Sequence, residues 1–91
     1  MEFAAKLRAM RAIQNMTQAE LSRESGVSQQ EISMLEKGTV LPVQDTEEKI
    51  RDSLGWSGEV DIGFRIIERN LPRELSARVL AIGEELDVET W

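Results

Sequence analysis

The sequence predicts an all-α fold, a compact helical bundle, and three observations carry that prediction. Apolar residues recur three and four positions apart, as on one face of an α-helix, more consistently than they alternate as in a strand. Two four-residue segments have the pattern that caps a helix at its N-terminus. Six Gly and two Pro divide the 91 residues into short blocks. A chain of this length suits a single domain with one modest core.

The first predicted helix covers residues 3–13. Phe3, Leu7 and Met10 stand four and three positions apart, which places them on one helical face. Asn15 follows as a stop signal, because Asn tolerates the left-handed conformation in which helices often end.

The next two helices are predicted from their ends. Residues 17–20, TQAE, and residues 28–31, SQQE, are both capping boxes, in which a hydroxyl accepts from the third backbone N–H of the helix. Gly26 ends the first of these helices, and the second runs to Lys37 before Gly38. Two capped helices that meet across so short a turn form a helix-turn-helix.

A fourth helix is predicted after Pro42, over residues 45–54, with Gly55 marking its end. Residues 60–71 fit two patterns, since their apolar residues alternate like a strand and also form a helical stripe. We favour helix, because two Ile residues are adjacent in this segment and Pro72 follows it like a new helix start.

The last predicted helix covers residues 72–86. Its apolar residues are spaced four, three and four apart, like a short coiled-coil seam. The residues of this seam are Leu75, Val79, Ile82 and Leu86. The helix either caps its own domain or pairs with a second subunit, and we expect it to help build a homodimer.

Composition excludes several functions. Without Cys or His, the chain has no disulfide, no thiolate or imidazole metal site and no Ser/His or Cys/His nucleophile. We therefore expect no enzyme, no cofactor and no metal. No apolar run reaches the roughly 18 residues of a membrane span, and the N-terminus lacks the apolar core of a signal peptide. These features predict a cytoplasmic protein without a membrane partner.

The charge is distributed unevenly. Eleven basic residues against 17 acidic ones give a net charge of −6, which argues against a nonspecific nucleic-acid coat. Residues 1–38 carry five basic and five acidic residues, whereas residues 39–91 carry six basic and twelve acidic ones. The whole excess of negative charge therefore lies after the helix-turn-helix.

One segment resembles a known family. The stretch LRAMRAIQNMTQAELSRESGVSQQEISMLEKG is similar to the lambda-repressor-like group of phage repressors, Cro proteins and XRE-type regulators, and the likeness covers about residues 3–56. Its matching pieces are LRxxR, TQxxL, the turn Gly-Val and ISxxExG. The residues of this chain that match these pieces are Leu7, Arg8, Arg11, Thr17, Gln18, Leu21, Gly26, Val27, Ile32, Ser33, Glu36 and Gly38. The resemblance implies a lambda-repressor-like bundle with one or two extra C-terminal helices.

The resemblance also implies which residues meet double-stranded DNA. The residues expected to read bases are Gln29, Gln30, Ser33 and Met34. Those expected to contact the DNA backbone are Gln18, Ser28, Lys37, Lys6 and Arg8. Arg11 and Glu36 are expected to form a partly buried structural ion pair.

Two functions remain open on this basis. The first is a sequence-specific transcriptional regulator, expected to be a repressor, in which residues 1–56 form the DNA-binding core and residues 57–91 a dimerising extension packed on it as one domain. The alternative is an antitoxin, which regulates its own gene through the same motif and binds a toxin through the acidic C-terminal half.

Overall fold

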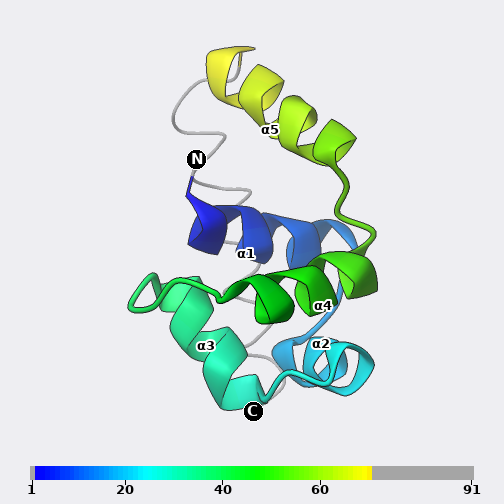
Figure 1. Cartoon of the computed structure of the whole chain (residues 1–91). Coiled ribbons are helices and arrows are strands. Elements are labelled where there is room, and N and C mark those ends of the chain that lie inside the picture. Colours follow the sequence, from blue (N-terminus) through cyan, green and yellow to red (C-terminus); the bar gives the residue numbers. More distant parts are fainter. Residues whose placement is uncertain (1, 71–91) are drawn as a thin grey trace.

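The computed structural model describes residues 2–70, and that part of the chain consists of five α-helices without a strand (Figure 1). The helices are α1 (Phe3–Ile13), α2 (Gln18–Ser25), α3 (Gln29–Lys37), α4 (Gln44–Leu54) and α5 (Gly58–Asn70). The predicted all-α fold is thereby confirmed. The predicted helix over residues 72–86, with its seam of Leu75, Val79, Ile82 and Leu86, lies outside the described residues.

The ends of α2 and α3 follow the predicted caps. Thr17 Oγ1 accepts a hydrogen bond from the backbone N–H of Glu20 at 3.1 Å, and Ser28 Oγ accepts from that of Glu31 at 3.2 Å. Gly26 and Gly38 close the two helices with φ of 77° and 75°. This left-handed conformation costs Gly little and other residues more, which is why each helix ends where it does.

Two boundaries differ from the prediction. Helix α4 begins at Gln44, one residue before the predicted start, and its N-cap Val43 has no side chain that could cap it. Helix α5 already begins at Gly58, which confirms the helical interpretation of the segment after residue 60 up to Asn70. Helix wins over strand there because Val60 and Phe64, one turn apart, both pack against the core.

The core lies between the first four helices. In Figure 1, α1 lies between α5 on one side and α3 on the other. Helix α3 packs against α1 and α2, while α4 packs against α2. The largest apolar side chains that are completely buried in this core are Leu7, Leu21, Ile32, Leu35 and Ile50.

Helix α5 docks through the indole of Trp56, which follows α4 and is buried. The ring stacks on Phe3 of α1 with 5.3 Å between centroids, and Phe64 of α5 meets it edge-on at 6.3 Å. The guanidinium carbon of Arg51 lies 4.3 Å from its centroid. A single aromatic side chain therefore joins α1, α4 and α5.

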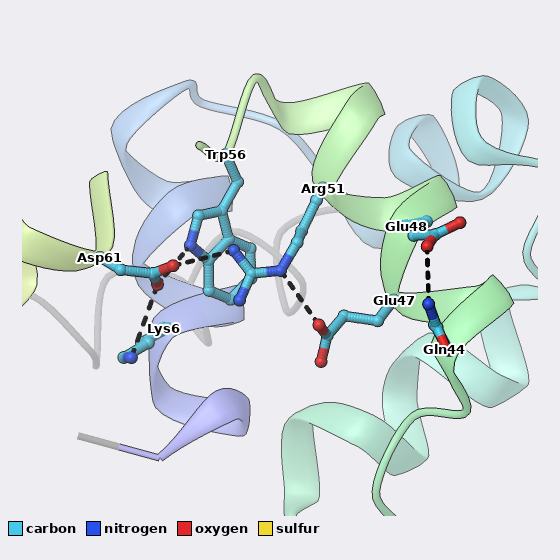
Figure 2. Close-up of polar contacts among 7 residues, drawn as sticks. All are labelled: Lys6, Gln44, Glu47, Glu48, Arg51, Trp56 and Asp61. Atoms are coloured by element: carbon cyan, nitrogen blue, oxygen red, sulfur yellow. Dashed lines mark hydrogen bonds and ion pairs between the residues drawn. The ribbon is translucent and has the colours of Figure 1, made fainter. Parts of the chain in front are cut away.

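The carboxylate of Asp61 completes this junction (Figure 2). It accepts from Trp56 Nε1 at 2.9 Å and from Arg51 Nη1 at 3.0 Å, and Lys6 Nζ lies 3.6 Å away. Burial acts to raise the pKa of Asp61, but the hydrogen bond from Trp56, the hydrogen bond and charge of Arg51 and the charge of Lys6 outweigh it. The pKa of Asp61 therefore lies below its ordinary value.

Within residues 2–70, no helix combines the length and the apolar character that crossing a bilayer requires.

We expect Asp61→Asn to lower the free energy of unfolding at neutral pH by about 1.5–3 kcal/mol, because it removes a charged acceptor from the junction. Since the folded pKa lies below the unfolded one, this stabilisation is complete above about pH 4 and is lost as the pH falls through the folded pKa. The difference between wild type and variant should therefore shrink in acid, as urea unfolding at a series of pH values can measure.

Asp45→Asn is the matched control, because the Asp45 side chain is 77% exposed and pairs with Lys49, one turn away. We expect it to cost less than about 0.5 kcal/mol. Equal effects of the two substitutions, or an Asp61→Asn effect that stays constant between neutral and acidic pH, would contradict the assigned junction.

Candidate functional site

Helix α3 presents one buried and one open face. With about 100° between successive residues, Ile32, Leu35 and Glu36 fall on one side of the helix, and all three are buried. Gln30 and Met34, one turn apart, fall on the opposite side and are exposed. The core contacts of α3 thus determine which of its side chains face outward.

The open face of α3 borders a shallow hollow of about 390 Å³, shared with the start of α2. The side chains that line it are Gln18, Gln29, Gln30, Ser33, Met34 and Lys37. The structure therefore brings all four predicted base-reading residues together with two of the predicted backbone contacts. The hollow therefore presents amides and a hydroxyl that can donate and accept hydrogen bonds, an apolar thioether and one ammonium group.

A buried ion pair joins α1 to the end of α3. Arg11 of α1 is fully buried and donates from Nε to Glu36 Oε1 at 2.6 Å and from Nη2 to Oε2 at 2.8 Å. Its Nη1 donates to the carbonyl oxygen of Met16 at 3.0 Å. Two parallel bonds between a guanidinium and a carboxylate fix orientation as well as distance, so the pair sets how α3 lies on α1.

Gln18 connects the hollow to the ion pair. It is the first residue of α2, and its Nε2 donates to Glu36 Oε2 at 2.6 Å. The Glu36 carboxylate thereby joins side chains from α1 and α2 to the end of α3. The sequence predicts only that Gln18 contacts the DNA backbone. It does not predict the bond to Glu36, because two partners that are 18 residues apart produce no recognisable local sequence pattern.

Two of the residues predicted to contact the DNA backbone, Lys6 and Arg8, lie outside the hollow. The ammonium of Lys6 faces Asp61 in the junction with α5, and Arg8 Nη1 donates to the backbone carbonyl of Glu36. Their charges interact with the protein because α1 runs between α3 and α5, so its cations lie close to acceptors on both sides.

The turn of the motif has its own polar support. Ser28, also predicted as a backbone contact, is exposed and uses its hydroxyl as the cap of α3. Ser25 stands where the family usually has an apolar residue, and its Oγ accepts from the backbone N–H of Val27 at 3.1 Å. This bond holds the chain at the turn while Val27 inserts its side chain into the core.

The hollow is bordered by few charged side chains. Among its six lining side chains only Lys37 carries a charge, and Glu31 lies at the exposed start of the same helix. The N-termini of α2 and α3 add the partial positive charge of their unsatisfied N–H groups. An anion met here would be held mainly by hydrogen bonds, since little net charge attracts it.

The sequence was also compared with known protein families, curated proteins and solved structures. A family model described as helix-turn-helix (HTH_3) matches residues 7–55, which cover α1 from Leu7 onward and the whole of α2, α3 and α4. Neither a search of curated proteins nor a search of solved structures returned a match.

We expect Glu36→Gln to lower the free energy of unfolding by about 3–5 kcal/mol, because it leaves the buried Arg11 charge without its counter-ion. Glu24→Gln is the control, since Glu24 is exposed on α2, and should change stability by less than about 0.5 kcal/mol. Urea unfolding at neutral pH gives both values. A loss for Glu36→Gln as small as the control's would mean that the pair does not hold α1 and α3 together.

Proposed function

Because this chain belongs to the helix-turn-helix family, a family of DNA-binding regulators, we propose that it is a sequence-specific transcriptional repressor. In this proposal a dimer places α3 of each subunit in the major groove of a two-fold operator, with half-sites about 34 Å apart. Repression then requires only that the bound dimer cover a promoter.

One observation carries the proposal, namely that the four side chains expected to read bases share the hollow beside α3. A helix fits the major groove of B-DNA, where each base pair presents its own pattern of donors, acceptors and methyl groups. The amides of Gln29 and Gln30 can donate to N7 and accept from N6–H of adenine. Ser33 and Met34 add a hydroxyl and an apolar contact one turn further along the helix.

The backbone contacts in this proposal come from the ends of helices. Gln18 and Ser28 lie at the N-termini of α2 and α3, where backbone N–H groups favour a phosphate. Lys37 supplies the positive charge at the other end of α3. Because these groups position the protein without reading sequence, specificity rests on the exposed face of α3.

Dimerisation is assigned to residues 57–91, and residues 1–56 remain the DNA-binding core. Two residues in the described part of this extension support the assignment. Ile62 and Ile66 are one turn apart on α5 and more than half exposed, so they offer apolar surface to a second subunit. Helices α5 and α3 lie on opposite sides of α1 (Figure 1). A dimer contact through α5 would therefore leave α3 exposed. The seam of Leu75, Val79, Ile82 and Leu86 would extend this interface.

The acidic second half of the chain favours one alternative, an antitoxin that binds a basic toxin through residues 39–91. Purification from the native host separates the two functions. Recovery of the protein with a co-encoded basic partner supports the antitoxin, whereas recovery of a homodimer with DNA supports the repressor.

Selection of bound sites from random duplex DNA tests the proposed function as a whole. We expect a palindromic consensus, because two subunits related by a two-fold axis read two inverted half-sites. A lack of enrichment even at low salt would contradict sequence-specific binding.

We expect the double substitution Gln29→Ala, Gln30→Ala to remove most of the preference for the selected site over scrambled DNA. Each lost bidentate contact to a base should cost about 1–3 kcal/mol of discrimination. Fluorescence anisotropy with the two duplexes measures the preference. Both residues are exposed, so thermal unfolding should stay close to that of the wild type.

Gln44→Ala is the matched control, because Gln44 is an exposed glutamine in the first turn of α4. It should leave the preference unchanged. If the double variant discriminated between the duplexes as well as the wild type, α3 would not be the reading helix.

A further inference from the structure

We propose that α3 selects half-sites of A·T pairs, in which Gln30 hydrogen-bonds an adenine and Met34 packs against the methyl group of a thymine. This specificity rests on the proposed function and adds the chemical class of base pair that the site takes. It follows from three features of α3: the exposure of Met34, the lack of a guanine reader, and the spacing of the two side chains.

Met34 is an apolar side chain in an otherwise polar hollow. It is 39% exposed and stands apart from the core cluster to which Ile32 and Leu35 belong. Its backbone carbonyl closes the end of the helix by accepting from Thr39 Oγ1 at 3.0 Å, so that contact does not involve the thioether. Among the groups that bases present in the major groove, the thymine 5-methyl is the apolar one.

Residues 29–36 of α3 include no Arg or Lys that could read guanine. The commonest specific contact to guanine is made by an Arg or Lys that donates to O6 and N7. Helix α3 contains no Arg, and its one Lys is the last residue, Lys37, at the end expected to meet phosphate. Arg8 and Arg11 of the neighbouring helix α1 instead donate to Glu36. The glutamine amides are therefore the base readers, and they match adenine.

The spacing of the two side chains sets the spacing of their bases. Gln30 and Met34 are four residues apart, which corresponds to about 6 Å along the helix axis. Successive base pairs lie about 3.4 Å apart. Because the major groove winds around the DNA axis, neighbouring base pairs are farther apart along the groove than along the axis. A helix that lies in the groove therefore meets the adenine and the thymine methyl about one to two base pairs apart.

Replacing thymine by uracil tests this directly, because uracil lacks the methyl group and keeps every hydrogen-bonding group. The probes are duplexes that the wild-type protein has selected from random DNA, resynthesised with uracil at one thymine position at a time. At one position in the half-site, we expect wild-type affinity to fall about fourfold, the effect of losing one buried methyl group.

Met34→Ala should bind the thymine and uracil duplexes equally, since its side chain ends at Cβ, three heavy atoms short of the methionine, and does not reach the methyl group. Gln30→Ala is the control, because it should bind more weakly overall and still distinguish uracil from thymine. Thermal unfolding of both variants should match that of the wild type, since both residues are exposed.

Other outcomes would overturn either the A·T specificity alone or the proposed function as well. Enrichment of G·C pairs at the positions read by α3 would overturn the specificity while leaving the proposed function intact. So would a wild-type protein that is indifferent to uracil at every position, or a Met34→Ala variant that keeps the wild-type sensitivity. A failure to enrich any sequence would instead overturn the proposed function, and the specificity with it.

Discussion

The buried ion pair between Arg11 and Glu36 fixes the end of α3 against α1. Burying two charges is costly, and the attraction between them compensates only when the geometry is good and further hydrogen bonds are made. Here Glu36 receives two bonds from Arg11 and one from Gln18, and its carbonyl receives one from Arg8. Three helices are thereby held at a single residue. Since Glu36 belongs to α3, this residue also determines which side of α3 faces outward.

The net negative charge of the chain and the use of its cations inside the fold both bear on how it could bind DNA. A chain with a net charge of −6 gains little from nonspecific attraction to phosphate. Several of its cations serve the fold, with Lys6 and Arg51 in the junction at Asp61 and Arg11 in the core. In the proposed function, recognition falls to neutral side chains on α3, whose hydrogen bonds and apolar contact would discriminate between bases. A protein of this kind would gain its preference from base contacts more than from attraction to phosphate.

Local signals in the sequence predicted the helices, and contacts between distant residues escaped prediction. The capping hydroxyls and closing glycines lie within one turn of the boundaries that they set, so the predicted boundaries of α2 and α3 lie within one residue of the observed ones. Helix α4 was misplaced by one residue because its N-cap Val43 offers no capping group. The roles of Lys6 and Gln18 could not be predicted, since their partners lie far along the chain. The residues assigned to base reading came from the motif, and the structure adds that they share one hollow.

A titration of the ¹⁵N-labelled protein with a selected duplex, followed through its backbone amide signals, shows which helix meets DNA. If α3 reads the bases, the largest shifts should occur at residues 18 and 28–37, which comprise the residues that line the hollow, α3 and its N-cap. Residues 58–70 of α5, on the far side of α1, should change little (Figure 1). The largest shifts on α5, with the signals of α3 unchanged, would contradict the assignment of α3 as the DNA-reading helix.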